Sequence, residues 1–389
     1  MTTETPRPRL SYLDNLRTAL VLLVVAHHLA LVYGAFAPFY YTEPPFTDPL
    51  AFVTLGVFVL FNQAWFMGGL FLMAGYFTPG SHDRAGGAGF VKSRLVRLGI
   101  PVLAAIFVIE PVARLGFFLM PESLTGISGP PTLAGYPKML GLGPLWFALM
   151  LLIFDLGYAL WRRIAGEPRP VVEERKGFPG VAAAIGAMLA LAVVSYLFRM
   201  IVPMGREIHL VLPFLNFPTI AYLPQYLGLF VLGIAASRRD WLSGLTASAG
   251  ATGAALALAA SVLLFPLAVS GRMFSVAFSQ AGEFAGNGHW QSAVYTAWDS
   301  IMAISMMLAL IALFRRAVKG GGRVSRFLAS HSYTVYIIHS ALLVFICYAM
   351  RGIGLPALAK FALAVIVVIP ACYAAAYAIR RLPGAKAVL

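Results

Sequence analysis

Two adjacent histidines, His27 and His28, stand in the interior of the first hydrophobic stretch of the chain, LRTALVLLVVAHHLALVYG, residues 16 to 34. Histidine changes its charge near neutral pH, so a histidine beside a substrate hydroxyl can act as a general base. Arg17 precedes His28 by eleven residues, and at about 100° per residue a helix turns the two side chains to within roughly 20° of one direction. One helix face is therefore predicted to present a cation at one end and a base roughly 16 Å further along.

The residues on this stretch also have simpler explanations. His28 could form a hydrogen bond to a neighbouring helix and take no part in chemistry, because spacing alone does not separate the two interpretations. His27 is turned by about 100° from His28 and is expected to pack or to form a structural hydrogen bond. Asp14 lies one turn before Arg17, where it can pair with the guanidinium or simply begin the helix.

A second candidate site is the stretch FVKSRLVRLGIP, residues 90 to 101, which opens a later hydrophobic segment. Arg94 and Arg97 are three residues apart, so a helix places them on neighbouring parts of one face. Guanidinium groups bind phosphate oxygens in a bidentate manner, and two of them one turn apart suit a pyrophosphate. The same arginines could instead anchor the helix end at a membrane surface, with their side chains extended toward water.

Carboxylates within hydrophobic segments are candidates to orient His28. An ionisable group at the centre of a bilayer costs about 2.5 to 3.5 kcal/mol, so it is expected to be paired or to serve a function. Asp299 and Glu110 fall in the half of their segments that should match the depth of His28, and either could assist it or could only form a hydrogen bond between helices. The other polar residues of these segments are Asn62, Gln63, Asp155, Gln225 and His339. Four loop residues are expected to face water, although they could contact an acceptor: Glu207, His209, Glu283 and His289.

The elements that carry these residues are predicted to be membrane-spanning helices. The chain has 389 residues, of which 60% are hydrophobic and 11% charged, and its mean hydropathy is +0.82. This composition is far from that of a soluble protein, and about ten stretches are long and apolar enough to cross a bilayer. We therefore expect an all-α polytopic bundle that forms a single integral-membrane domain over residues 1–389. The predicted spans are approximately 16–35, 51–77, 94–119, 143–163, 179–200, 219–237, 246–270, 291–314, 332–350 and 356–379.

The distribution of positive charge predicts the orientation of this bundle. The net charge is +14, but lysines and arginines gather in short loops on one side, which follows the positive-inside rule and excludes a nucleic-acid partner. An even number of spans then places both termini in the cytoplasm and the protein in the plasma (inner) membrane, among lipids. The two cysteines, Cys347 and Cys372, lie inside predicted spans, where they are expected to pack among helices, and no metal site is expected.

Four stretches of the chain are similar to one protein family. YLDNLRTALVLLVVAHH, residues 12 to 28, resembles the opening helix of the acyltransferase family 3 membrane proteins. Three more stretches match in order: FLMAGYFTPGSHDRAGGAGFVKSRLVRLGIP (71–101), GPLWFALMLL (143–152) and SHSYTVYIIHSALL (330–343). The resemblance spans nearly the whole chain, and the family includes O-acetyltransferases and a group of glucan-succinylating proteins.

The resemblance implies an O-acyltransferase that takes an acyl group from cytoplasmic acyl-CoA and transfers it to a hydroxyl of a glycan or similar acceptor outside. In the family, the histidine that matches His28 is regarded as catalytic, and the arginines that match Arg94 and Arg97 are associated with acyl-CoA. From the residues themselves we further expect Arg17 or Lys92 to help bind the CoA phosphates. His28 is expected to be the general base, assisted by a carboxylate such as Asp299 or Glu110.

Several features of the reaction remain open at the level of sequence. No serine or cysteine is clearly placed beside His28 as an acyl carrier, so direct transfer is favoured over a covalent acyl-enzyme. Acetyl-CoA and succinyl-CoA are both candidate donors, and no residue identifies the acceptor. The alternative is a proton-coupled transporter or flippase for a sugar or lipid-linked metabolite, because buried His, Asp and Glu residues also serve proton relays.

Overall fold

The computed structural model describes residues 10–34, 39–43, 48–166, 177–206, 208–209, 215–270 and 282–389, and long helices account for most of them. The long helices are α1 (Ser11–Gly34), α2 (Pro49–Gln63), α3 (Phe66–Arg94), α7 (Trp146–Ala165), α8 (Val181–Ile201), α9 (Leu223–Arg238), α10 (Ala247–Ala268), α11 (Trp290–Ala317), α12 (Arg323–Ala349) and α13 (Ala357–Ile379). The prediction of an all-α polytopic bundle is confirmed.

Short elements connect the long helices. The strands within the described residues are β1 (Ile208–His209) and β2 (Asn216–Phe217), which pair antiparallel. The short helical segments are η1 (Leu95–Gly99), α4 (Ile100–Ala104), η2 (Ala105–Ile109), α5 (Glu110–Arg114), η3 (Leu115–Leu119), α6 (Glu122–Thr125), η4 (Leu133–Met139), η5 (Gly143–Leu145), η6 (Ile220–Tyr222), η7 (Glu283–Ala285) and α14 (Ala385–Val388).

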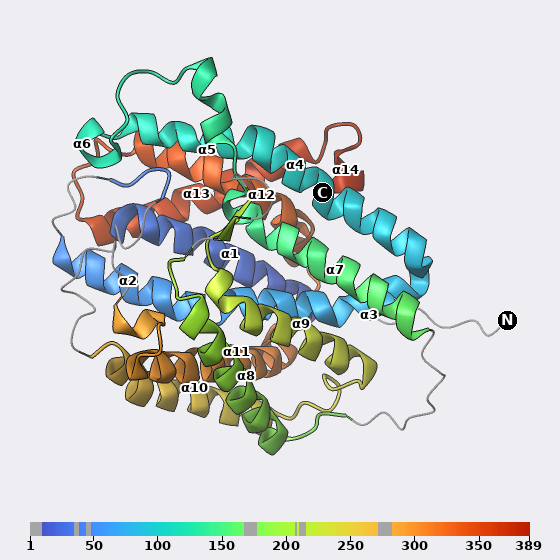
Figure 1. Ribbon diagram of the computed structural model, residues 1–389. Helices are drawn as coiled ribbons and strands as arrows, with labels where there is room; N and C mark the ends of the chain where they lie inside the picture. The colour runs from blue at the N-terminus through green and yellow to red at the C-terminus, as the bar shows by residue number, and fades with distance from the viewer. Residues whose placement is uncertain are drawn as a thin grey trace.

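Nine helical stretches of the described residues are long and apolar enough to cross a membrane. One of them, Pro49–Leu119, has 71 residues and contains both predicted spans 51–77 and 94–119. It folds back at Gly86, whose φ of +68° favours glycine because other side chains rarely adopt that conformation. Figure 1 shows α3 running to the right and the segments around α4 and α5 returning above it. The other eight stretches each coincide with one predicted span.

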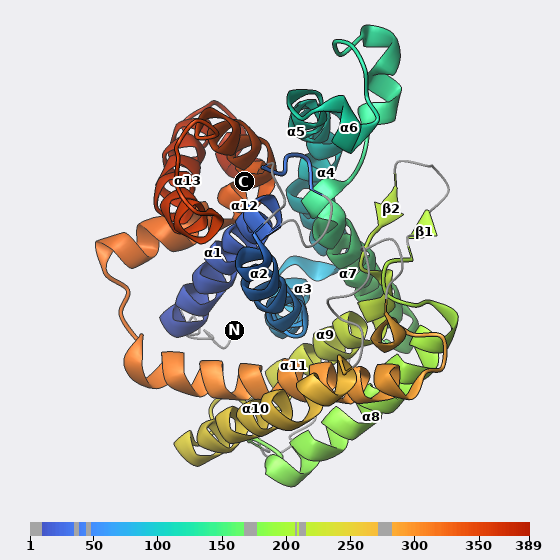
Figure 2. The same ribbon diagram turned by 90° about the vertical axis from the view of Figure 1, so that its left-hand side faces the viewer.

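Helix α1 lies at the centre of the bundle. Figure 2 shows it enclosed by α2 and α3, by α12 and α13, and by α11. The apolar stretch of α1 is 67% buried, whereas that of α8 at the periphery is only 17% buried. The helix that carries His27 and His28 is therefore surrounded by protein, and the outer helices separate it from lipid.

Small residues let the central helices approach closely. A Cβ atom on Gly75 of α3 would meet the backbone oxygen of Phe230 on α9, and one on Gly233 of α9 would meet that of Leu72 on α3. Lipid is as apolar as the helix surfaces, so close packing replaces the hydrophobic effect as the force that holds such helices together. The close contact between α3 and α9 holds α3 in the position in which it packs against α1.

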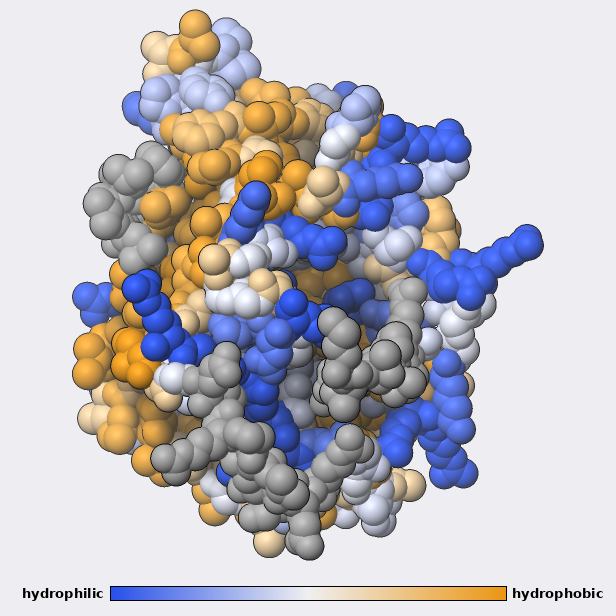
Figure 3. All heavy atoms as spheres, turned by 90° about the vertical axis from the view of Figure 1, so that its right-hand side faces the viewer, coloured by the Kyte–Doolittle hydropathy of each residue, from blue (hydrophilic) through white to orange (hydrophobic). Residues whose placement is uncertain are grey.

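Basic residues gather at one end of the bundle. The last turn of α7 carries Arg162 and Arg163, that of α9 carries Arg238, and that of α11 carries Arg315 and Arg316. Helices α7 and α9 end on the right of Figure 1, and Figure 3 shows that hydrophilic side chains cover much of this end between hydrophobic flanks. We call this end the basic face.

The close approach of α3 and α9 makes Gly75 a sensitive position. We expect Gly75→Leu to lower the unfolding temperature of the detergent-purified protein, because overpacking a closely packed contact costs about 1 to 3 kcal/mol. Gly157→Ala in α7 is the matched control, since a Cβ atom there meets nothing within 4 Å. Equal unfolding temperatures for the two variants would contradict the close packing.

Candidate active site

His28 is held by two partners at one ring nitrogen. Its Nδ1 atom lies 2.9 Å from the backbone oxygen of Val24, one turn earlier on α1, and 3.1 Å from Nε2 of His339 on α12. Nδ1 of His339 in turn lies 2.6 Å from the backbone oxygen of Tyr336. The two imidazole rings are 4.9 Å apart between centroids. A chain of hydrogen bonds therefore runs from α1 into α12.

The carbonyl oxygens assign the protons of both rings. A carbonyl oxygen only accepts hydrogen bonds, so Nδ1 of His339 carries the proton that it donates to Tyr336. The neutral ring then has a lone pair on Nε2, which accepts from Nδ1 of His28, and this same proton also faces the oxygen of Val24. The proton positions are assigned from these partners. Within the described part of the chain Nε2 of His28 has no hydrogen-bond partner, so this nitrogen keeps the free lone pair that a general base uses.

The surroundings distinguish His28 from the histidine beside it. His28 is half-buried, and the ring of Phe39 lies 5.1 Å from it between centroids. His27 is buried and stacks on Phe66 at 5.0 Å, in agreement with the prediction that it packs. His339 is fully buried, with 0% of its surface exposed. Of the three histidines, His28 is therefore the one with surface available to a substrate.

Arg17 and Asp14 pair at the basic end of α1. Nη2 of Arg17 lies 3.1 Å from Oδ1 of Asp14, and the arginine side chain is 43% exposed. This pairing is one of the two roles that the sequence predicted for Asp14. Arg17 thus presents a cation near the basic face, on the same helix as His28.

The arginines of the second candidate site have different environments. Nε of Arg94 lies 2.9 Å from Oδ2 of the buried Asp155 on α7, and Thr78 donates to the other oxygen of that carboxylate at 2.8 Å. Arg97 is exposed, and its backbone oxygen accepts a hydrogen bond from Tyr333 at 2.7 Å. Lys92 is also exposed.

Arg97 lies in η1, a π-helical turn that follows α3, and its side chain is exposed, whereas Arg94 pairs with Asp155. The expectation that the two arginines share one face stays a prediction. A π-turn often accompanies a functional position, but no pattern in the sequence announced this one.

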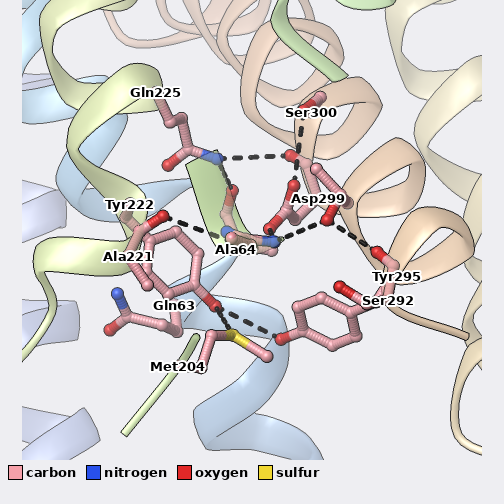
Figure 4. Close-up of polar contacts among 12 residues, drawn as sticks. Gln63, Ala64, Met204, Ala221, Tyr222, Gln225, Ser292, Tyr295, Asp299 and Ser300 are labelled. Carbon is pink, nitrogen blue, oxygen red and sulfur yellow. Dashed lines mark hydrogen bonds and ion pairs between the residues drawn. The ribbon is translucent and has the colours of Figure 1, made fainter. Parts of the chain in front are cut away.

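Asp299 is paired with an arginine from another helix, for which the sequence analysis proposed no role. Its Oδ2 lies 2.6 Å from Nη1 of Arg199, at the end of α8, and the two side chains are 1% and 0% exposed. Arg199 also donates to Thr296 at 3.1 Å and lies 4.4 Å from the ring centroid of Tyr222. Figure 4 shows Asp299 and Tyr295 of α11 facing Tyr222 of η6 and Gln225 of α9.

The prediction that Asp299 orients His28 therefore finds no supporting contact within the described part of the chain. Depth along a helix can be read from sequence, but the direction of a side chain around the bundle axis cannot. Arg199 lies one residue inside the end of a predicted span, and this position was the available signal that it is buried. The ion pair joins α8 to α11 and has a structural explanation.

Glu110 is likewise committed to other partners. Tyr40 donates to its Oε2 at 2.7 Å, and Nε of Arg114 lies 2.8 Å from its Oε1. Tyr40 follows Phe39, the residue whose ring contacts His28. Among the described residues Glu110 makes no contact with His28, so it supports the loop that covers the histidine and does not touch the ring.

The loop residues named from the sequence are dispersed. Glu283 accepts a hydrogen bond from Gln291 of α11, and His289 is exposed at the start of that helix. His209 lies in β1. Glu207 lies outside the described residues.

Comparisons with known proteins identify the family. The family model described as an acyltransferase domain matches residues 10–377. The chain belongs to this acyltransferase family. It is also 26% identical over 365 residues to the glucans biosynthesis protein C of Salmonella paratyphi B and of Salmonella dublin, and 25% identical over 368 residues to that of Salmonella heidelberg. Each alignment covers 87% of this chain and 84% of the relative.

In this acyltransferase, one helix contacts every stretch that carries the resemblance. The α12 stretch SHSYTVYIIHSALL supplies Tyr333, which bonds to the oxygen of Arg97, and His339, which bonds to His28. Between them Tyr336 donates to the oxygen of Pro144 in the GPLW stretch. The three residues stand three apart and so follow one side of the helix. The sequence analysis gave His339 no role beyond that of a polar residue in a span.

The buried ion pair yields a prediction about Asp299. We expect Asp299→Asn to destabilise the acyltransferase by about 3 to 5 kcal/mol, because it leaves the charge of Arg199 buried without a partner. Thermal unfolding in detergent measures the loss. Replacing both residues, Arg199→Met with Asp299→Leu, should restore much of it, since an apolar pair carries no uncompensated charge. A double variant less stable than Asp299→Asn would contradict this account.

Proposed function

We propose that this acyltransferase moves an acyl group from a CoA thioester bound at the basic face to a hydroxyl of a carbohydrate-type acceptor that enters from the opposite end. The observation that carries the proposal is the free Nε2 of His28. This atom belongs to a ring fixed at its other nitrogen, and the ring is half-buried at the centre of the bundle. A base fixed in this way is suited to remove a proton from a hydroxyl.

The donor end of the proposal uses the cations near the basic face. Arg97 and Lys92 are exposed, Arg17 is 43% exposed, and Arg94 is held by Asp155 with 20% of its side chain still accessible. Arginine and lysine side chains bind the phosphates of a nucleotide. Among the described residues neither Arg97 nor Lys92 pairs with a carboxylate, and of the two Arg97 has the guanidinium group that binds phosphate in a bidentate manner.

The chemistry at His28 is a direct transfer. The acceptor hydroxyl gives its proton to Nε2 of His28 while its oxygen attacks the carbonyl carbon of the thioester. The carbon–oxygen bond forms, the carbon–sulfur bond breaks, and the departing CoA thiolate takes the proton from Nε2. His28 then returns to its starting form, and the products are the acylated acceptor and free CoA.

Different observations support the proposed acceptor and the proposed location in the membrane. The relatives are named for glucan biosynthesis, which favours a carbohydrate acceptor. We propose acetyl or succinyl as the acyl group, as the resemblance in sequence implies. The gathering of arginines at the basic face favours a cytoplasmic position for that face and for both termini, with the protein in the inner membrane. The donor would then be drawn from the cytoplasm and the acceptor from the other side.

Transfer of label tests the proposal. Membranes with the wild type, His28→Ala or His331→Ala are incubated with acetyl-CoA or succinyl-CoA labelled in the acyl group, and label is counted in the glycan fraction. We expect the rate to fall by about 10²- to 10⁴-fold in His28→Ala, because a general base contributes that much. His331→Ala, which replaces a partly exposed histidine on α12, should retain activity.

Two outcomes would overturn the proposal. Full activity of His28→Ala would contradict the role of His28 as the general base. Absence of transfer by the wild type, together with absence of CoA binding by the purified protein, would contradict acyl-CoA as the donor. Substrate flux coupled to a proton gradient would then favour a transporter.

The two arginines give a separate prediction. Arg97→Ala should raise KM for the acyl-CoA roughly ten- to hundredfold, because a charge-assisted hydrogen bond contributes about 1.5 to 3 kcal/mol. It should leave the unfolding temperature unchanged, whereas Arg94→Ala should lower it by stripping Asp155 of its partner. Arg239→Ala, which removes an exposed charge at the end of α9, is the control for charge alone. An unchanged KM in Arg97→Ala would exclude it from the donor site.

A further inference from the structure

We propose that His339 is a positioning residue for the base, fixing the ring of His28 by accepting its Nδ1 hydrogen. This inference rests on the proposed function, in which Nε2 of His28 removes the proton of the acceptor. Such a base works only when its other nitrogen is protonated, so that the lone pair stands on Nε2. The role is the one that a carboxylate fills in many catalytic histidine pairs.

The carboxylates that lie inside the predicted spans all pair with arginines and are not partners of His28. Asp299 pairs with Arg199, Glu110 with Arg114, and Asp155 with Arg94. Among the described residues, the titratable groups that face His28 are His339 from α12 and His27 from α1. Of these, His339 is the one within hydrogen-bonding distance, at 3.1 Å.

His339 is itself rigidly held. It is completely buried, and its Nδ1 hydrogen is donated to the oxygen of Tyr336 at 2.6 Å. The hydroxyl of Tyr336 donates to the backbone oxygen of Pro144 in η5, which precedes α7, and its ring stacks on His339 with 6.0 Å between centroids. The Nε2 lone pair of His339 therefore has a fixed direction, which is toward α1.

A histidine offers this position an advantage that a carboxylate lacks. Both rings are neutral before the reaction, so the resting site buries no charge in the bundle. When the acceptor proton arrives at Nε2 of His28, the ring becomes a cation. Its Nδ1 hydrogen then points at the lone pair of His339 and the oxygen of Val24, and both acceptors stabilise the new charge.

Three α12 variants test the role of His339. His339→Leu removes the acceptor, and we expect kcat to fall about a hundredfold with both KM values unchanged, because the base loses its alignment and the substrate sites do not. His339→Gln keeps an acceptor oxygen at the end of a side chain of similar reach, and it should recover most of kcat. Ser340→Ala, the next buried polar residue of α12, controls for loss of polarity and should match the wild type.

The outcomes separate this inference from the proposed function. If His28→Ala is inactive while His339→Leu matches the wild type, only the positioning role is overturned. If kcat falls equally in His339→Gln and His339→Leu, the role of His339 as a hydrogen-bond acceptor is overturned. Absence of transfer by the wild type would instead be a failure of the proposed function.

A double variant guards against a folding defect. If His339 acts only through His28, His339→Leu should cause no further loss of residual transfer in a His28→Ala background. Rates are normalised to the folded fraction measured by gel filtration in detergent. An additional loss of equal size in that background would overturn the positioning role.

Discussion

Ion pairing between helices is the constraint on which the rest of this bundle depends. Hydrocarbon supplies no hydrogen bonds, so a charged side chain inside the bundle must find its partner on the protein. Asp155 takes Arg94, Asp299 takes Arg199, and Glu43 near the start of α2 takes Lys360 of α13. The first two pairs join helices that are far apart in the sequence, and the third joins the segment 39–43 to α13. These carboxylates are therefore engaged with cations, and the partners of the His28 ring nitrogen are a neutral imidazole and a backbone oxygen.

Helix α12 links the two ends of the proposed reaction path. Tyr333 contacts the turn that carries Arg97, and His339, six residues later, contacts His28. An α-helix rises about 1.5 Å per residue, so these contacts lie roughly 9 Å apart along one rigid element. Helix α12 therefore fixes the distance between the donor-binding region and the base. In the proposal this helix binds neither substrate itself.

The sequence predicted what depends on length, spacing and composition. It placed the spans, including the two within Pro49–Leu119, and the i, i+3 pairing of Asp14 with Arg17. It could not predict pairings that depend on how helices are rotated against one another. Asp299 pairs with Arg199 on α8, and this partner could not be predicted because it depends on how α8 and α11 are rotated. Arg97 lies in the π-turn η1, which helix propensities do not reveal.

Asn15, at the basic end of α1, has a consequence for the opposite half of that helix. Its amide donates to the backbone oxygens of Val318 at 2.9 Å and Gly320 at 3.0 Å, and Ser325 of α12 donates to its side-chain oxygen. Further along, Thr18 of α1 lies 3.2 Å from Ser332 of α12. These contacts set the axial register of α1 and α12, which run parallel to each other. A slip by a single residue, about 1.5 Å, would carry the two histidine rings out of hydrogen-bonding reach. The contacts of Asn15 and Thr18, at the basic end of α1, therefore determine the position of His28 along the bundle axis.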